Sequence, residues 1–394
     1  MKSPPRAPKS LIRPARVRHL LARTLECPTA PFREGCVIAW VREFAAANPH
    51  LRLREDRDGN LTLTRRGVRP SARPLVLAAH MDHPGFRALR SKKVRGGFRI
   101  EALFLGGVRP EYFPGARARF HTGEKGIVAR VERTRRDPRS GEQRVTLSAR
   151  KPVPAGALGT WDLPGFRISR RNPDLVETRA ADDLAGLSGV LALLERIDEI
   201  DPKRRVDVRG LFTRGEEVGF VGALAVAQGK RLPRDARIVT IEASKALRDA
   251  PQGAGPILRV GDRTSVFDDG LSRWLGRVAT GLARSGRFHT GRFRYQRKLM
   301  DGGTCESTAY QLFGYRCAGL CLPLGNYHNM SERGRIAVET IRLSDMVGLV
   351  RFFEGLVRAD DDAPRPGRTD PLRKRLGATL QRGRSGLARD PFAG

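Results

Sequence analysis

The sequence predicts an α/β protein in which a doubly wound, mixed sheet carries an inserted small β domain. Three observations lead to this prediction. Pro74 to Ala79 form a continuous apolar run, which is typical of a strand buried on both faces. From Phe86 to about Arg179, short alternating apolar runs are interrupted by glycine and proline, a pattern typical of a small all-β domain. After Asp182-Asp183, leucines return at helical spacing.

The elements before the insertion are two helices, a hairpin and the buried strand. Val17 to Leu25 are predicted to form a short helix, and a second apolar helical face ends at Asn48-Pro49. Leucines alternate on either side of Asp58-Gly59-Asn60, which predicts a β-hairpin. The buried strand that follows ends in His80-Met81-Asp82, and ligand sites of open α/β sheets lie at such carboxyl ends.

The α/β pattern continues after the insertion and fades near the end of the chain. The predicted strands cover residues 206–213, 237–242 and 318–322, and the predicted helices lie around 184–194, 271–282 and 345–357. The predicted organisation is a basic disordered start (1–16), an α/β domain (17–85 and 180–358), an inserted β domain (86–179) and a disordered tail (359–394).

The charge of the chain is unusual. Of 394 residues, 74 are Lys or Arg and 42 are Asp or Glu, so the formal net charge is +32, which raises the question of a nucleic-acid partner. The basic residues are mostly Arg and are spread through every segment, without aromatic residues at stacking positions. We therefore do not predict a nucleic-acid-binding surface.

The cysteines and the apolar segments limit the cellular setting. Five cysteines, an odd number, lack the spacing of paired ligands, which argues against a disulfide framework and favours a reducing, cytoplasmic compartment. Met1 to Arg18 contain no apolar core of a signal peptide, and no later segment approaches the length of a membrane span. We expect neither export nor a membrane partner.

Five residues of metal-binding types recur at predicted element ends: His80, Asp182, Glu217, Glu242 and His328. Two imidazoles and three carboxylates suit a pair of divalent metals, with one carboxylate shared and one His plus one carboxylate completing each side. Asp82 is placed to accept a hydrogen bond from the second ring nitrogen of His80. Glu216 remains as a carboxylate that need not bind metal, as expected of a general base.

Each motif also has an ordinary structural interpretation. Asp182-Asp183 can cap a helix, and adjacent glutamates such as Glu216 and Glu217 usually form a solvated surface pair. A histidine after an apolar strand is most often a surface or core residue. The joint occurrence is harder to explain in this way, because the chain has only seven histidines and two of them fall where a metal site needs them.

In their order along the chain, these motifs resemble those of the dinuclear, co-catalytic zinc aminopeptidases of the glutamyl/leucyl aminopeptidase type, which often assemble as tetrahedral dodecamers. The motifs are His80-Met81-Asp82, Ala181 to Gly186, Glu216 to Gly219, the strand ending in Glu242, Gly302-Gly303-Thr304 and Tyr327-His328. The resemblance covers Leu20 to Arg358. It implies a zinc-exopeptidase-like catalytic domain, and residues 86–179 correspond to the inserted β-barrel domain of that family.

The resemblance also implies roles for single residues. Asp182 would bridge two divalent metal ions, expected to be Zn with Co or Mn as alternatives. His80 and Glu242 would complete one metal site, and Glu217 and His328 the other. Glu216 would be the general base, with Asp82 as a further catalytic residue, and a hydroxide bridging the metals would release N-terminal residues from peptide substrates. A homo-oligomer, with a dodecamer as the family's form, is implied as well.

Three positions depart from the family pattern, and two alternatives stay open. Glu242 stands where Asp is usual, His83 where an acidic residue is usual, and Cys305 where Asp is usual. One alternative is a carboxypeptidase or amide deacylase on the same scaffold, against which the position of the insertion argues. The other is a basic nucleic-acid-binding protein with a degenerate catalytic domain, for which only the net charge argues.

Overall fold

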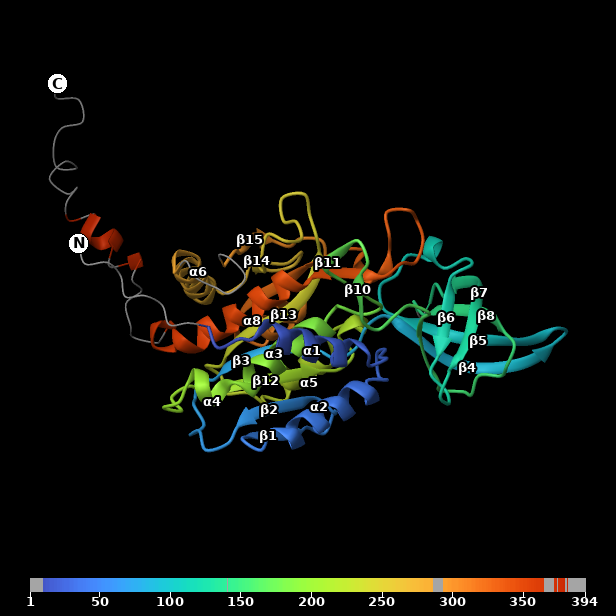
Figure 1. The fold of residues 1–394 in the computed structure, drawn as a ribbon, viewed down its shortest axis with the longest axis horizontal. Coiled ribbons are helices and arrows are strands. Elements are labelled where there is room, and N and C mark those ends of the chain that lie inside the picture. Colours follow the sequence, from blue (N-terminus) through green and yellow to red (C-terminus); the bar gives the residue numbers. More distant parts are fainter. Residues whose placement is uncertain are drawn as a thin grey trace, which may run out of the picture.

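The centre of the fold is a mixed sheet. The computed structural model describes residues 10–139, 141–285, 293–364, 372–373, 375–379 and 381. Within these residues the sheet has eight strands (Figure 1). In spatial order they are β1 (Leu51–Glu55), β2 (Leu61–Arg65), β12 (Val208–Thr213), β3 (Leu75–His80), β13 (Arg237–Lys245), β16 (Arg316–Leu324), β14 (Ile257–Gly261) and β15 (Gln296–Leu299).

The four central strands, β12, β3, β13 and β16, run parallel to one another. Every residue of β3 is buried, as the continuous apolar run predicts for a strand covered on both faces. The register places Thr213 beside His80 and Glu242 beside Cys321. Because parallel strands end at the same edge of a sheet, the residues that follow β12, β3 and β16 lie close to one another at the carboxyl ends.

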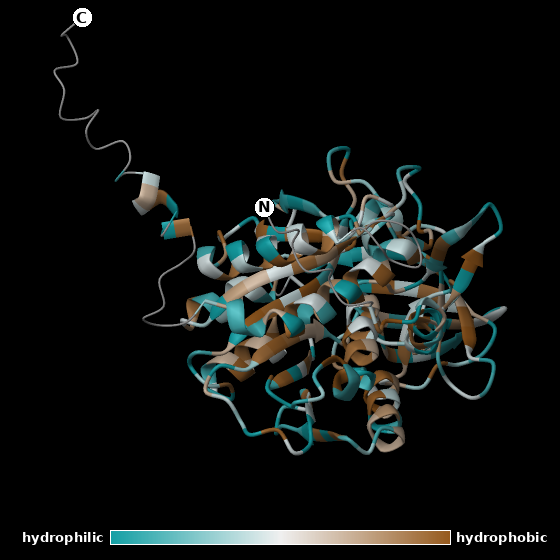
Figure 2. Ribbon diagram, turned by 60° about the vertical axis from the view of Figure 1, so that its left-hand side comes forward, coloured by the Kyte–Doolittle hydropathy of each residue, from teal (hydrophilic) through white to brown (hydrophobic). Residues whose placement is uncertain are grey.

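Helices cover both faces of this sheet, as in a doubly wound fold. Leu75 and Leu77 pack in the core shared with α1, α3, α6 and α8, whereas Val76 and Ala78 pack with α5 and α7 on the opposite face. Figure 2 shows brown, apolar residues on the strands and on the helices that cover them. The helices are α1 (Pro14–Leu25), α2 (Gly35–Ala47), α3 (Leu184–Glu195), α4 (Ile197–Ile200), α5 (Val221–Gln228), α6 (Asp269–Arg284), α7 (Glu306–Leu312) and α8 (Leu343–Arg358), with short 3-10 helices η1 (Pro110–Tyr112), η2 (Glu216–Val218), η3 (Tyr327–Asn329) and η4 (Asp360–Asp362).

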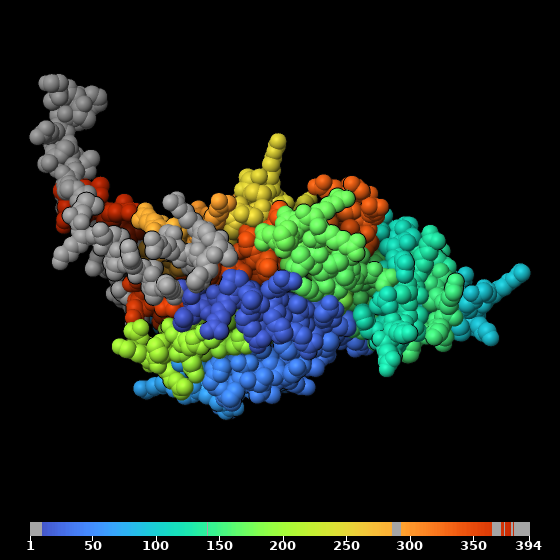
Figure 3. All heavy atoms as spheres, viewed as in Figure 1, coloured from blue at the N-terminus to red at the C-terminus, as the bar shows by residue number. Residues whose placement is uncertain are grey.

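A closed barrel is inserted between β3 and α3, and it projects from one end of the molecule (Figure 3). Its aromatic core includes Phe86, Phe104, Phe113 and Trp161, and the Phe86 and Trp161 ring centroids lie 4.8 Å apart in an edge-on arrangement. In barrel order its strands are β4 (Gly85–Val94), β5 (Gly97–Leu105), β8 (Gln143–Ala149), β7 (Ile127–Arg136), β6 (Arg117–Phe120) and β9 (Leu158–Trp161). The predicted fold class, a mixed α/β sheet domain with an inserted small β-barrel, is confirmed.

The end of the predicted insertion differs from the closed barrel. The strands β10 (Arg167–Ser169) and β11 (Asn172–Thr178) fall within the predicted insertion, but they form a three-stranded sheet with β17 (Glu339–Arg342). Val176 accordingly packs in the core of the large domain. Apolar alternation alone does not tell which partner a strand pairs with, so this pairing lies outside what the pattern predicts. The domain limits themselves remain a prediction.

Some residues of the two ends that are predicted to be disordered are described in the structure, and the prediction of disorder stays a prediction. Ile12 is buried, the Ser10 hydroxyl donates to Glu354, and α1 begins at Pro14, a residue that favours the first turn of a helix. After α8, Ala363 is buried, and residues 372–373, 375–379 and 381 are helical. The other residues of the two predicted segments, 1–9 at the start and 365–371, 374, 380 and 382–394 in the tail, lie outside the described residues. In the part of the chain that is described, no helix has the length and apolar character needed to cross a membrane.

Candidate metal centre

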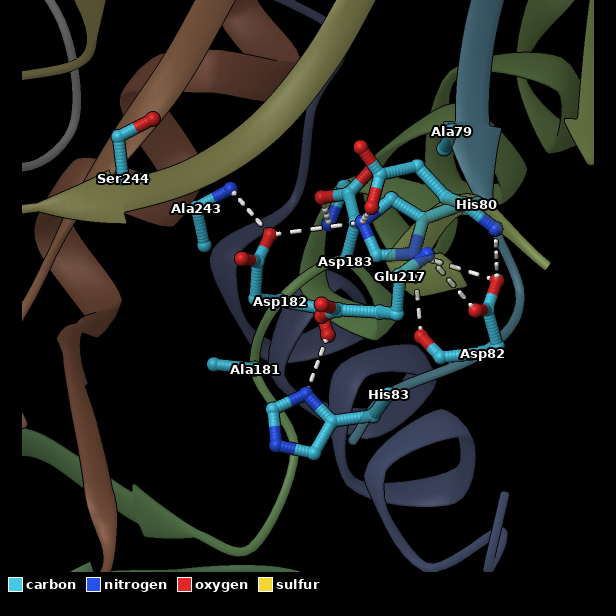
Figure 4. Close-up of polar contacts among 12 residues, drawn as sticks. Ala79, His80, Asp82, His83, Ala181, Asp182, Asp183, Glu217, Ala243 and Ser244 are labelled. Atoms are coloured by element: carbon cyan, nitrogen blue, oxygen red, sulfur yellow. Dashed lines mark hydrogen bonds and ion pairs between the residues drawn. The ribbon is translucent and has the colours of Figure 1, made fainter. Parts of the chain in front are cut away.

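The residues predicted to bind metal gather at the carboxyl edge of the central strands. His80 is the last residue of β3, and Glu242 lies within β13. Glu217 lies on η2, Asp182 precedes α3, and His328 lies on η3. Figure 4 shows His80, Asp182 and Glu217 converging from separate segments of the chain.

These five residues form two groups that share Asp182. The ligand atoms of His80, Asp182 and Glu242 lie within 4.8 Å of one another, and so do those of Asp182, Glu217 and His328. Oδ1 of Asp182 lies 3.6 Å from Nε2 of His80, and its Oδ2 lies 3.7 Å from Nε2 of His328. Each oxygen of one buried carboxylate therefore faces a different imidazole, which is the arrangement that a ligand shared by two ions requires.

Glu216 lies beside the two groups. Its Oε2 is 4.0 Å from Nε2 of His80, and its ligand atom lies within 4.8 Å of those of His80 and Glu217. The strand β12 ends at Thr213, as the predicted strand over 206–213 does, and both glutamates lie on η2. The turn between β12 and η2 contains Gly215, whose φ of 63° is a left-handed conformation that glycine adopts without a steric penalty.

Asp82 makes hydrogen bonds that differ from the one expected. The nearest acceptor for Nδ1 of His80 is the main-chain oxygen of Asp82 at 3.0 Å, whereas the Asp82 carboxylate oxygen is 3.6 Å away. That carboxylate instead accepts hydrogen bonds from the main-chain amides of Glu216 at 3.0 Å and Glu217 at 3.1 Å. Asp82 therefore fixes the turn that carries both glutamates, and its carbonyl fixes the ring of His80.

Asp182 and His328 are held by contacts from three directions. The amide of Ala243 donates to Oδ1 of Asp182 at 3.0 Å, and Nδ1 of His83 lies 2.7 Å from the main-chain oxygen of Asp182. Nδ1 of His328 lies 2.9 Å from the main-chain oxygen of Gly107, which belongs to the segment that follows β5 of the barrel. The inserted domain thus contributes directly to the orientation of one predicted ligand.

Glu339 is a functional candidate that the sequence analysis missed. It is fully buried, and its carboxylate accepts hydrogen bonds from the main-chain amides of Ala181 at 2.6 Å and His328 at 2.8 Å. One side chain therefore joins the two segments that carry the shared carboxylate and a ligand imidazole. Its only sequence signal is an acidic residue at the start of a short apolar strand, which is too common to indicate this role.

The backbone around His328 has an uncommon conformation. Asn326, His328 and Asn329 have φ values of 54°, 52° and 63°, in the left-handed region that residues with side chains rarely adopt. Such conformations persist where the surrounding structure holds them, and they cluster at functional sites. The hydrogen bond from the His328 amide to Glu339 and the bond from Asn329 Nδ2 to the Arg179 carbonyl at 3.1 Å supply that support.

The electrostatics of the site reflect several carboxylates in a buried space. Burial raises the pKa of Glu216, and the charges of Glu242 and Glu217 raise it further. Burial and the charge of Asp182 raise the pKa of Glu242 to about 8. Burial alone would lower the pKa values of His80 and His328, but the carboxylates that face them raise both values well above the usual one. The site therefore crowds several carboxyl groups together, and bound cations would favour their ionised forms.

The unpaired polar atoms test whether divalent metals fit this site. Nε2 of His80, Oε1 of Glu217 and Oε1 of Glu242 are buried and satisfy no hydrogen-bond geometry within the described part of the chain, although Oε1 of Glu217 lies 3.1 Å from Nε2 of His328. Leaving such atoms without partners is costly, and all three belong to the two groups around Asp182. Imidazole nitrogens and carboxylate oxygens are ligands of Zn, Co and Mn ions, so the residues present fit the metals that the resemblance implies.

The departure at Cys305 and the glutamate that follows it can be judged from their surroundings. Cys305 is buried immediately before α7, and burial raises the pKa of its thiol, so it has the environment of an inert buried cysteine. Glu306 is buried as well, with its carboxylate 2.5 Å from the Thr213 hydroxyl, and burial raises its pKa to about 7. Neither side chain belongs to the two ligand groups.

Arg259 is a second residue that the sequence analysis missed. Its guanidinium is buried, it donates from Nη1 to the Ser244 hydroxyl at 3.3 Å, and its charge acts on Glu242. The neighbouring strand has Gly319 opposite, where a Cβ atom would lie 3.1 Å from Cβ of Arg259. Glycine at position 319 therefore leaves room for the side chain of Arg259, whose guanidinium acts on Glu242.

Comparison with known proteins agrees with this geometry. The family model described as M42 glutamyl aminopeptidase matches residues 59–341, which include all the predicted ligands. No curated protein matches the chain.

Several solved structures share the fold. The TET aminopeptidase of the marine sediment archaeon Thaumarchaeota archaeon SCGC AB-539-E09 has a TM-score of 0.70 and 19% identity, over 91% of this chain and 99% of that chain. A PhTET1 dodecamer structure has a TM-score of 0.68 and 20% identity, over 88% and 99%. The Pyrococcus horikoshii TET1 peptidase, which can assemble into a tetrahedron or a large octahedral shell, has a TM-score of 0.67 and 20% identity, over 86% and 98%. At these identities the likeness is one of fold.

Proposed function

The chain belongs to the M42 glutamyl aminopeptidase family, and from this premise we propose that it is a metal-dependent aminopeptidase that removes N-terminal residues from peptides. The observation that carries the proposal is the position of Asp182, whose two carboxylate oxygens face His80 and His328 at 3.6 and 3.7 Å. A chain in which the scaffold had lost catalysis would have no reason to keep this complete set of ligands buried together.

The proposed metal ligands divide between two divalent ions. His80 and Glu242 would hold one ion, Glu217 and His328 the other, and Asp182 would contact both. Divalent ions held there would supply Lewis-acid chemistry that activates a water and polarises the scissile carbonyl. Zinc is the expected metal, with cobalt and manganese as alternatives that the same ligands accept.

Glu216 is the proposed general base. Its carboxylate lies in the same buried space, and each of the two ligand groups around Asp182 would offer an ion three ligands without it. Glu216 would accept the proton of the attacking water and pass it to the leaving amine. The amide of Glu216 is bonded to Asp82, so Asp82 would keep this carboxylate in place during the transfer.

Selection of N-terminal residues would depend on the free α-amine. A protonated α-amine would be attracted by the carboxylates of this pocket, and a neutral α-amine could bind a metal ion through its lone pair. An acetylated N-terminus has neither a charge nor a free lone pair. We further propose a homo-oligomer, with a tetrahedral dodecamer as the expected form, because the matched TET1 peptidase can assemble into a tetrahedron. The cytoplasmic setting stays a prediction.

A substrate panel tests the reaction class. Metal-loaded protein is incubated with matched peptides whose N-terminus is free or acetylated, and whose C-terminus is free or amidated. We expect release of the N-terminal residue from both peptides with a free N-terminus and no turnover of the acetylated ones. Removal of the acetyl group would instead identify a deacylase, and release of the C-terminal residue a carboxypeptidase. Either result would overturn the proposed activity.

A further inference from the structure

Two of the five cysteines lie against each other between α1 and α2. Cys27 follows α1 and is buried, and Cys36 is the second residue of α2 and is exposed. Sγ of Cys27 lies 3.7 Å from the main-chain oxygen of Cys36. A side-chain hydrogen bond with the other thiol is the largest influence on the pKa of each cysteine. The spacing along the sequence gave no indication of this pair, because it follows from the way the connection between the helices folds back.

The surroundings make the two thiols different. Cys36 lies at the N-terminus of a 13-residue helix, close to the guanidinium groups of Arg179 and Arg23. The hydrogen bond with Cys27, followed by these two positive charges, lowers the pKa of Cys36 to about 7 despite partial burial. The same hydrogen bond, together with burial, raises the pKa of Cys27. Cys36 is therefore the exposed nucleophile, and Cys27 is its protected neighbour.

The segment between the cysteines is hydrogen-bonded to two segments of the candidate metal centre, the one that follows His80 and the one that precedes Glu216. The Thr29 hydroxyl donates to the main-chain oxygen of Met81 at 2.7 Å. The Glu34 carboxylate accepts hydrogen bonds from the Gly215 amide at 3.2 Å and from Nε of Arg214 at 2.9 Å. These contacts hold both ends of the connection in place, so the thiols are brought together by the folded chain before any bond forms between them.

We propose that Cys27 and Cys36 form a reversible thiol–disulfide site that reacts with small-molecule disulfides such as oxidised glutathione. The Cys36 thiolate attacks one sulfur of the reagent, which breaks the reagent's S–S bond, forms a mixed disulfide and releases one thiol. The Cys27 thiol then loses its proton and attacks Sγ of Cys36, which forms the internal disulfide and releases the second thiol. Two protein thiols are oxidised, and one reagent disulfide is reduced to two thiols.

Mass spectrometry of the full-length protein tests this site directly. The reduced protein is treated with oxidised glutathione, alkylated and digested with trypsin. Arg33 lies between the two cysteines, so trypsin separates them unless a disulfide joins the two peptides. We expect wild-type protein to lose two hydrogens without retaining glutathione and to give the linked peptides. Treatment with a dithiol should restore the free thiols.

Two matched variants separate the roles of the cysteines. Cys27→Ser should stop at the mixed disulfide, with one glutathione on Cys36. Cys36→Ser should leave Cys27 unmodified, because that thiol is buried and has a raised pKa. Wild-type protein that keeps glutathione without forming the linked peptides, or that does not react at all, would overturn the proposal. Equal labelling of Cys27 in Cys36→Ser and of Cys36 in Cys27→Ser would also overturn it. The readout is independent of peptide hydrolysis, so it remains valid if the proposed activity fails.

Discussion

Asp182 is the residue on which the proposed metal centre depends most, because it belongs to both ligand groups. Asp182→Asn removes the negative charge at this shared position while keeping the shape of the side chain. We expect it to weaken binding of both metals, whereas Glu242→Gln should weaken only one of them. The measurement is the metal content per chain after dialysis against a series of free zinc concentrations. Equal metal content in Asp182→Asn and wild-type protein would contradict the shared-ligand assignment.

Glu339 is expected to act through the backbone of two ligand segments. Glu339→Gln leaves one oxygen for the two amides of Ala181 and His328, so one of them loses its acceptor. We expect metal affinity to fall by about 10- to 100-fold, the usual effect of removing a partner of metal ligands. Isothermal titration with zinc measures this.

The control for this variant is Glu332→Gln, which changes an exposed glutamate a few residues after His328. It should keep wild-type zinc affinity. Glu339→Asp, which keeps both oxygens on a shorter side chain, should recover part of the affinity lost in Glu339→Gln. If Glu339→Gln lowered thermal stability but left zinc affinity unchanged, its role would be structural only.

Among single residues, the candidate ligands could be chosen from the sequence, whereas the residues that support them could not. His80, Asp182, Glu217, Glu242 and His328 could be selected because metal-binding residue types are rare at strand ends and their order resembles a known family. Glu339 and the pairing of Asp82 with two amides could not. Both depend on hydrogen bonds to the main chain of distant segments, and such bonds leave no residue pattern.

Among the elements, strands with strong apolar patterns were the easiest to predict. The run that forms β3 is buried along its whole length, and the alternating runs between β4 and β9 form the barrel. The pairing of β11 with β17 could not be predicted, because a strand of seven residues carries no information about a partner more than one hundred residues away. The start of α1 was missed because Pro14 favours a helix only at its first turn.

The barrel gives a prediction about pH through His121, which follows β6. Nε2 of His121 lies 2.9 Å from the Thr160 hydroxyl, and burial, followed by the charges of Arg179 and Arg119, lowers the pKa of His121 from 6.5 to about 4. Between these values the unfolded chain binds a proton that the folded chain does not bind. The contribution of His121 to stability is therefore full above 6.5 and is lost as the pH falls toward 4.

The test compares denaturant unfolding of wild-type protein and His121→Gln across this pH range. We expect the wild-type free energy of unfolding to fall more steeply with decreasing pH than that of the variant. The contributions of the other titrating groups cancel when one curve is subtracted from the other. If the glutamine keeps the bond to Thr160, the two curves should coincide near neutral pH and separate toward acid pH, where the wild-type protein becomes the less stable of the two. Curves that stay parallel from neutral to acid pH would exclude a depressed pKa at His121.

For the whole molecule, the oligomeric state is the first open prediction. A single chain has a mass of 43.6 kDa, and the proposed homo-oligomer should have a mass many times larger. Light scattering coupled to size-exclusion chromatography measures this mass without a shape assumption. Because the chain carries a net charge of +32, the measurement should be made at two salt concentrations to separate assembly from charge effects. A mass near that of one chain in both buffers would contradict the proposal.

The proposed catalytic unit also combines both domains, since His328 is oriented by the carbonyl of Gly107 from the inserted domain and Glu216 by Asp82 from the sheet domain.

The central claim is that this unit holds metals through five ligands and uses Glu216 as a base. Its most direct test is turnover of an unblocked peptide by wild-type protein and Glu216→Gln, with metal content measured in the same samples. We expect equal metal content and a fall in kcat of about 10²- to 10⁴-fold, the usual contribution of a general base. Full activity in the variant, or loss of activity that follows loss of metal, would contradict the assignment of Glu216.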